Sequence, residues 1–169
     1  MKELHTPLSE EDIAGLRVGD VIRLSGTIFC GRDAVLPKIC KMLDDGTAVD
    51  AGLDFSGSVM FHTAVSPAGI GPTSSNKVDI EGSFETLSRH GLKIHLGKGA
   101  ISSDSISKLA SLNAIYAVIP PVTALLGSKT SGVEVVAFPE LGIEALHRVD
   151  VVGYEAIVAA AHGKSIYDK

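Results

Sequence analysis

Three short segments combine glycine with cationic or hydroxyl side chains, and each directly follows a predicted strand. They are Cys30-Gly31-Arg32-Asp33, residues 69–77 and Gly97-Lys98-Gly99. In open α/β sheets, ligands bind beyond the carboxyl ends of parallel strands, where such segments meet. We therefore expect one binding site built from all three segments.

The side chains of this expected site suit a small anion with two negative charges. The cations are Arg32, Lys77 and Lys98, and the hydroxyl groups are those of Thr73, Ser74 and Ser75. Hydrogen bonds from charged donors are the stronger class, which favours a carboxylate or phosphate ligand. The turn at Lys98 lacks the GxxxxGK[ST] spacing of a nucleotide phosphate loop, so a nucleotide enzyme is the weaker alternative.

Each segment also has a purely structural interpretation. Asp33 could cap the helix that is expected to follow it, and residues 69–77 could form a plain turn. The six histidines show no HxxxH or HExxH spacing. Because His95 stands between Ile94 and Leu96, it is expected on an exposed strand face.

The elements that position these segments are expected to alternate between strand and helix. Strands are predicted over residues 21–29, 58–65, 92–96, 114–119, 132–137, 146–152 and 156–161. Helices are predicted to begin at Ser9, to include Ile39, Met42 and Leu43, and to cover about 79–90 and 102–112, with a loop over 46–57. This alternation predicts an α/β layer architecture with a mixed sheet. Residues 1–20 are interpreted as an N-terminal arm and 21–169 as one domain.

The composition excludes several classes of protein. Fifteen Lys and Arg against twenty Asp and Glu give a net charge of −5, which argues against nucleic-acid binding. The longest apolar stretch, about 115–126, is too short to span a membrane. The start lacks a secretory signal pattern, so we expect a cytoplasmic protein with reduced thiols. Cys30 and Cys40 are interpreted as apolar packing residues, and two cysteines cannot hold an iron–sulfur cluster alone. A mean hydropathy of +0.28 favours a buried sheet or a contact with another subunit.

Four ordered motifs resemble those of the iron–sulfur hydro-lyases. Leu24–Ala34, Gly71–Asp79, Leu96–Gly99 and Val133–Ala145 resemble the elements SGTIYTARDAAH, GPTTSGRMD, IGKG and EVVAFPELGMEA of that family. The match is to the C-terminal domain of class I fumarases and to the β subunit of two-subunit fumarases and L-tartrate dehydratases. It extends from about residue 17 to the C-terminus.

The resemblance implies a fold, a reaction and a partner. The fold would be a three-layer β/β/α swivelling-type domain, and the reaction the reversible hydration of a C4 dicarboxylate such as fumarate or tartrate. A four-iron cluster would be supplied by an α subunit, within a hetero-oligomer or around a homodimer of β chains. This chain would bind no metal itself. Thr73 and Lys98 would be catalytic, with Thr73 as the base. The substrate-binding residues would be Arg32, Asp33, Thr73, Ser74, Lys77 and Lys98.

Three positions depart from the family pattern. Leu36 stands where a histidine is usual, Lys77 replaces an arginine and its bidentate fork, and Pro120-Pro121 replaces a glycine pair. These departures leave the choice of dicarboxylate open. They also leave open the alternative of a non-catalytic anion-binding or regulatory subunit with the same fold.

Overall fold

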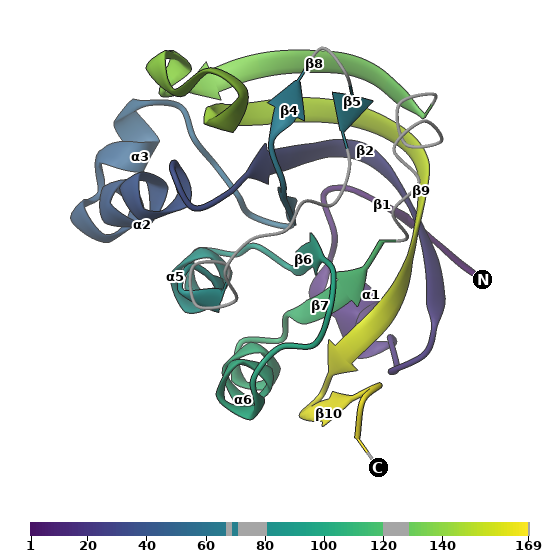
Figure 1. Ribbon diagram of the computed structural model, residues 1–169. Helices are drawn as coiled ribbons and strands as arrows, with labels where there is room; N and C mark the ends of the chain where they lie inside the picture. Colours follow the sequence, from purple (N-terminus) through teal and green to yellow (C-terminus); the bar gives the residue numbers. More distant parts are fainter. Residues whose placement is uncertain (67–68, 71–80, 120–128, 169) are drawn as a thin grey trace.

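The computed structural model describes residues 1–66, 69–70, 81–119 and 129–168, and these form a mixed α/β structure (Figure 1). The strands are β1 (Lys2–His5), β2 (Val21–Gly31), β3 (Val59–His62), β4 (Val65–Ser66), β5 (Gly69–Ile70), β6 (Ile94–Gly97), β7 (Ile115–Val118), β8 (Thr130–Ala137), β9 (Leu146–Ala161) and β10 (Lys164–Ser165). The helices are α1 (Glu10–Ala14), α2 (Leu36–Asp45), α3 (Thr47–Asp50), α5 (Phe84–Arg89), α6 (Ser103–Ser111) and a 3-10 helix, η1 (Pro139–Glu144).

Five strands close into a barrel within the main sheet, which has eight strands in the described part of the chain. The pairs β2–β3, β3–β6 and β6–β7 are parallel, whereas β9 pairs antiparallel with both β7 and β2 and so closes the ring. β1 extends the sheet beside β2, and β8 pairs with the first part of β9, from Leu146 to Val151. The prediction of a mixed α/β sheet is confirmed, and barrel closure is a feature that the sequence pattern did not indicate.

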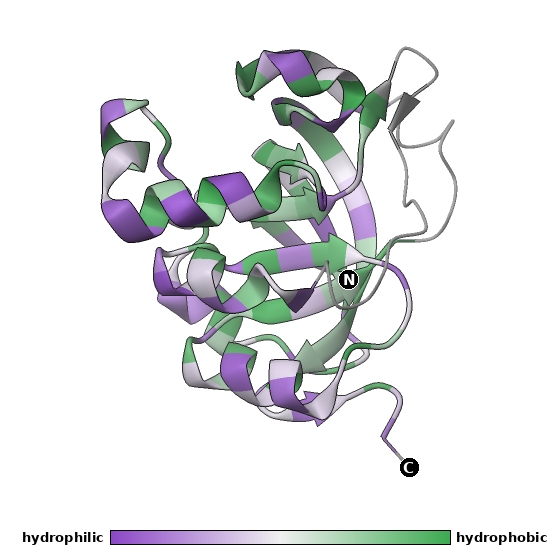
Figure 2. Ribbon diagram, turned by 60° about the vertical axis from the view of Figure 1, so that its left-hand side comes forward, coloured by the Kyte–Doolittle hydropathy of each residue, from purple (hydrophilic) through white to green (hydrophobic). Residues whose placement is uncertain are grey.

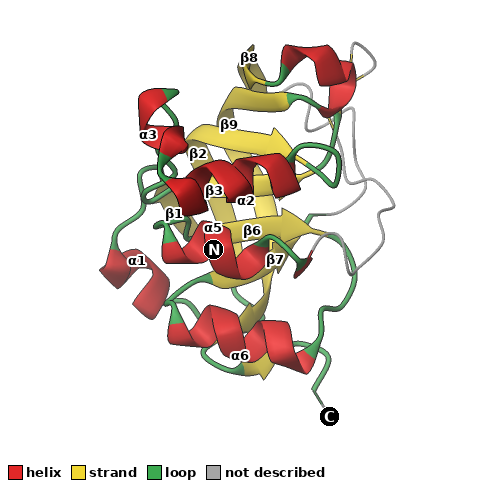
Figure 3. Cartoon of the chain, turned by 90° about the vertical axis from the view of Figure 1, so that its left-hand side faces the viewer, coloured by secondary structure: helices red, strands yellow, loops and turns green. Residues whose placement is uncertain are grey.

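Helices α2, α5 and α6 cover one face of the barrel (Figure 3). Alternate strand residues therefore enter two different apolar layers: Phe61 packs inside the barrel, and Met60 packs toward the helices. Figure 2 shows the helices as bands of hydrophilic and hydrophobic residues over mainly hydrophobic strands. No helix in the described ranges is long and apolar enough to cross a membrane.

The four parallel strands bring their carboxyl ends to one edge of the barrel. The register aligns Gly31 with His62 on the neighbouring strand, and the next pairing continues the row to Gly97 and Val118. Arg32 and Lys98 are each the next residue after a strand of this row. The edge that we expected to carry chemistry therefore exists, with two of its predicted cations on it.

The structure corrects two predictions about the elements. The two closing strands are one continuous strand, β9, which passes through Gly153 in the left-handed region at φ +67°. The predicted loop over 46–57 contains the short helix α3. The first twenty residues also contact the sheet, since β1 pairs with β2 and Ile13 and Leu16 are fully buried.

Candidate functional site

The backbone of Arg32 is fixed by the tight passage from β2 into α2. Its carbonyl oxygen accepts hydrogen bonds from the amides of Val35 and Leu36, at 3.1 and 2.9 Å. A Cβ atom on the preceding Gly31 would lie 3.0 Å from Val35 Cγ1 and 3.2 Å from Leu36 Cδ2. There is therefore little room for a larger residue at position 31, because Val35 and Leu36 at the start of α2 pack closely against the strand.

The Arg32 side chain is held by two carboxylates. Its Nε atom donates to Asp33 Oδ1 at 3.0 Å and lies 3.2 Å from Glu144 Oε1. The Arg32 side chain is only 19% exposed, so water screens these pairs less than ordinary surface ion pairs. Asp33, interpreted as a possible helix cap, thus faces the arginine beside it.

Glu144 is a site residue that the sequence interpretation missed. It lies in the motif Val133–Ala145, and the resemblance of that motif to the family does not indicate a contact with Arg32. The carboxylate comes from η1, which directly precedes β9. Because β9 pairs with β2 along nine registered positions, the start of β9 lies beside the end of β2.

Lys98 lies in an exposed turn that Tyr116 supports from β7. The Tyr116 hydroxyl donates to the carbonyl oxygen of Gly99 at 3.0 Å. A Cβ atom on Gly97 would lie 3.1 Å from the same hydroxyl oxygen, and Gly99 has φ +81°. Burial raises the pKa of the Tyr116 hydroxyl, so it remains a neutral donor. Both glycines of this turn are thus explained by its geometry.

Arg32 and Lys98 lie on the same barrel edge, separated by one strand. Since neighbouring strands are about 4.8 Å apart, their backbones are separated by about 10 Å. Long side chains at that separation can reach the two ends of one small dianion. The remaining predicted site residues, Thr73, Ser74 and Lys77, lie outside the described residues, as does Pro120-Pro121.

Glu81 connects the chain just after this undescribed segment to the start of α6. Its Oε1 atom accepts hydrogen bonds from the amide of Ser102 at 2.9 Å and from the Ser102 hydroxyl at 2.6 Å, and also from the Ser105 hydroxyl. A carboxylate at a helix N-terminus is favourable because of the helix dipole. Glu81 is therefore held at the start of α6, a few residues after the Lys98 turn.

Two buried histidines lie beneath the site edge, and one of them overturns a prediction. His95, expected on an exposed face, is 0% exposed. Its Nδ1 lies 3.0 Å from His62 Nε2, and its Nε2 lies 2.9 Å from the Ser88 hydroxyl on α5. The sheet is covered by helices on this side, so strand alternation does not expose the residue.

The two cysteines are not positioned as metal ligands. Cys30 is fully buried in the barrel core, and Cys40 lies on α2. Burial raises the pKa of both thiols, that of Cys40 to about 11, so neither is a thiolate at neutral pH. Within the described ranges, no group of three or more His, Cys, Asp and Glu side chains could hold a metal ion.

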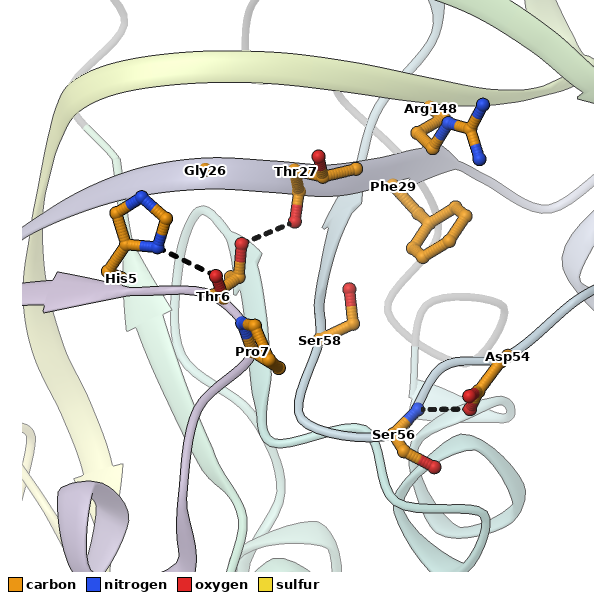
Figure 4. A pocket seen from close by; sticks show the side chains of 10 residues that line it. All are labelled: His5, Thr6, Pro7, Gly26, Thr27, Phe29, Asp54, Ser56, Ser58 and Arg148. Carbon is orange, nitrogen blue, oxygen red and sulfur yellow. Dashed lines mark hydrogen bonds between the residues drawn. The ribbon is translucent and has the colours of Figure 1, made fainter.

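A hollow of about 310 Å³ lies on another part of the barrel (Figure 4). It is bordered by Thr6, Thr27, Ser58 and Arg148, among others. Ser58 directly precedes β3, so the hollow lies toward the opposite ends of the parallel strands from Arg32 and Lys98. Figure 4 shows its hydroxyl groups from several elements, with the Thr6 side chain bonded to the carbonyl of Thr27. The lining of this hollow is both polar and apolar and includes none of the predicted site residues.

The sequence pattern of one protein family, described as the fumarase C-terminus, matches residues 2–169. The chain belongs to the fumarase C-terminus family. The resemblance inferred from the four motifs is therefore confirmed.

Three relatives differ in how much of their own length this chain covers. The protein "Putative L(+)-tartrate dehydratase subunit beta" of Methanocaldococcus jannaschii is 28% identical, and the match covers 100% of this chain and 92% of the relative. The L(+)-tartrate dehydratase subunit beta of Escherichia coli is 27% identical over 98% of this chain and 86% of its own length. Fumarate hydratase 2 of Leishmania major is 28% identical, but this chain spans only 31% of it.

Leu36, which stands where the family usually has a histidine, is a packing residue. Leu36 is 1% exposed and packs in the apolar layer between α2 and the sheet. Its side chain therefore contributes to packing, and a polar role at this position is absent from this member of the fumarase C-terminus family. The ion pairs of Arg32 do not involve it.

Proposed function

We propose that this chain is the β subunit of a hydro-lyase that adds water to, or removes it from, a C4 dicarboxylate such as fumarate or tartrate. The observation that supports this most directly is the placement of Arg32 and Lys98 on one barrel edge. The proposal also draws on the names of the relatives, which include tartrate dehydratase β subunits and fumarate hydratases. Each substrate of the proposed class has two carboxylates. Arg32 follows β2 and Lys98 follows β6, so one cation is available for each carboxylate.

In the proposed reaction, the cations stabilise charge that develops next to the reacting carbon. Removal of a proton beside a carboxylate increases the negative charge on that carboxylate. Arg32, Lys77 and Lys98 would bind the two carboxylates, and fixed cations there stabilise the transition state more than the ground state. Ser74 would donate a hydrogen bond, and Asp33 would act through its ion pair with Arg32.

Thr73 is the proposed base. A hydroxyl group is a weak base at its ordinary pKa, so the role requires a site that is crowded with cations and closed to water. Lys98 is the proposed second catalytic residue, because an ammonium group close to the hydroxyl favours its ionised form.

The iron–sulfur cluster of the proposed enzyme belongs to an α subunit. The residues of this chain do not fit the cluster, because a fully buried Cys30 with a raised pKa is unsuited to bind iron. We propose that this chain forms a hetero-oligomer with the α subunit. The alternative assembly is a homodimer of β chains. A swivelling-type domain over residues 21–169 with an arm over 1–20, and a cytoplasmic location, complete the proposal.

Reconstitution with the α subunit tests the proposal. Each chain is purified alone and then mixed, and the hydration of fumarate and the dehydration of L(+)-tartrate are followed by absorbance. The expected result is activity only in the mixture, with loss of activity after iron is removed by a chelator. Full activity of this chain alone in the presence of the chelator would overturn the proposal.

A non-catalytic anion-binding or regulatory subunit is the second candidate, and the apolar residue at position 36 favours it. Leu36 is buried in the layer between α2 and the sheet, where the family usually has a histidine, so one polar group of the family pattern is missing. The variants Thr73→Ala and Lys98→Ala, measured in the assembled complex, discriminate the two candidates. Turnover that falls by orders of magnitude supports the enzyme, and unchanged turnover supports a scaffold.

A further inference from the structure

The ion pair between Arg32 and Glu144 joins two elements that are distant in the sequence. Glu144 Oε1 lies 3.2 Å from Arg32 Nε, and Asp33 Oδ1 lies 3.0 Å from the same atom. The single N–H of Nε donates its hydrogen bond to Asp33, and Glu144 adds an ion pair at the same atom. Together the two carboxylates restrict the positions that the guanidinium group can take.

The backbone around Glu144 is itself rigidly placed. The amide of Ala145 donates to the carbonyl of Gly142 at 3.0 Å, and the amide of Leu141 donates to Phe138 at 3.0 Å. Ala145 and Leu146, which follow Glu144 directly, are 1% and 0% exposed. The carboxylate thus projects from a segment whose next residues are packed in the protein core.

Asp33 and Glu144 differ in how they can restrict the Arg32 side chain relative to the barrel. Asp33 is the chain neighbour of Arg32 and moves with it, so their ion pair cannot hold the arginine relative to the rest of the barrel. Glu144 comes from η1 and is anchored to β9, the strand that closes the barrel against β2. The longer-range pair is therefore the one that can set the direction of the Arg32 side chain.

We propose that Glu144 is a positioning residue that orients the Arg32 guanidinium toward a substrate carboxylate. This inference rests on the proposed function, in which Arg32 binds that carboxylate. In this arrangement Glu144 holds the Nε edge, and the substrate carboxylate is bound by the terminal nitrogens. Orientation before binding reduces the side-chain entropy that is lost when the substrate binds.

Kinetics of the assembled α–β complex provide the first test. Glu144→Ala should raise KM by about tenfold, the order expected when one close, partly buried charged contact is lost, and kcat should change much less. Glu144→Asp should recover part of the loss, because it keeps the charge. The matched control is Glu140→Gln, on the same 3-10 helix and exposed, which should leave KM unchanged. A merely structural role would lower the thermal midpoint without changing KM, and that result would overturn the inference.

Nitrogen-15 NMR of the full chain provides a second test that does not depend on activity. The Nε–H signal of Arg32 is assigned by its loss in Arg32→Lys. In the wild type it should be sharp and protected from exchange, and in Glu144→Ala it should broaden and exchange faster, with Glu140→Gln as the control. An unchanged signal would overturn the inference. If the wild-type complex has no hydro-lyase activity, the proposed function fails, and the NMR result still decides whether Glu144 orients Arg32.

Discussion

His62 and His95 form a buried pair beneath the site edge, with His62 Nε2 3.0 Å from His95 Nδ1. The Phe84 ring packs on both imidazoles, at centroid distances of 5.2 and 4.3 Å, and Ser88 completes the chain at His95 Nε2. The Nδ1 atom of His62 is buried and has no hydrogen-bond partner among the described residues. The pair links the last residue of β3 to the second residue of β6, the strand that Lys98 directly follows.

This pair predicts a stability that decreases in acid. Burial lowers the pKa of His62 to about 3, and burial together with the nearby His62 lowers the pKa of His95 well below its usual value. Unfolded histidines take up protons near pH 6.5, so below that pH the unfolded state binds more protons than the folded state. The stabilising effect is therefore fully present above about pH 6.5 and is lost as the pH falls toward 3.

Urea unfolding at a series of pH values measures this effect. The free energy of unfolding should fall by at most about 1.4 kcal/mol per pH unit for each histidine. A double variant, His62→Gln with His95→Gln, should show a smaller change in the free energy of unfolding per pH unit. The control His90→Gln, at the C-terminal end of α5, should keep the wild-type change. A stability that is the same at pH 5 and pH 7.5 would contradict this account.

Gly31 predicts a steric effect on stability. A methyl group there would meet Val35 and Leu36 of α2 at 3.0 to 3.2 Å. Gly31→Ala should lower the free energy of unfolding by about 1 to 3 kcal/mol, as for other over-packed sites. Gly15→Ala is the matched control, because its Cβ would lie 3.5 Å from the nearest atom and its φ is −80°. The prediction fails if the two variants have the same urea midpoint.

Tyr116→Phe predicts a kinetic effect on the Lys98 turn. The substitution removes only the hydroxyl that donates to the Gly99 carbonyl at 3.0 Å. Because the turn then loses one support, the KM of the assembled complex should rise several-fold, while stability falls by about 1 kcal/mol. Tyr167→Phe, at an exposed tyrosine, serves as the control. Steady-state kinetics identical to the wild type would show that Tyr116 does not position Lys98.

The sequence predicts this molecule best where the evidence is local. Arg32 and Lys98 were expected to follow predicted strands, and each is the next residue after a strand, β2 and β6 respectively. The capping pattern at Ser9 predicts α1, where Ser9 and Asp12 exchange hydrogen bonds. These signals depend on residues only a few positions apart.

The sequence fails where distant segments meet. His95 was expected on an exposed face because its strand alternates, yet helices and barrel bury both faces of β6. Two separate strands were expected over 146–152 and 156–161, but Gly153 at φ +67° lies within one strand, β9, which continues through it. The contact of Glu144 with Arg32 depends on barrel closure by β9, which no local pattern indicates.

The most direct test of the central claim is the turnover of the α–β complex with Lys98→Ala in this chain. Lys98 is exposed on its turn, so the substitution should leave the thermal midpoint and the assembly unchanged. The account predicts that kcat/KM for the dicarboxylate falls by at least about a hundredfold, as for the loss of a group that stabilises developing charge. A complex that assembles normally and turns over the dicarboxylate used by the wild type at the wild-type rate would contradict it.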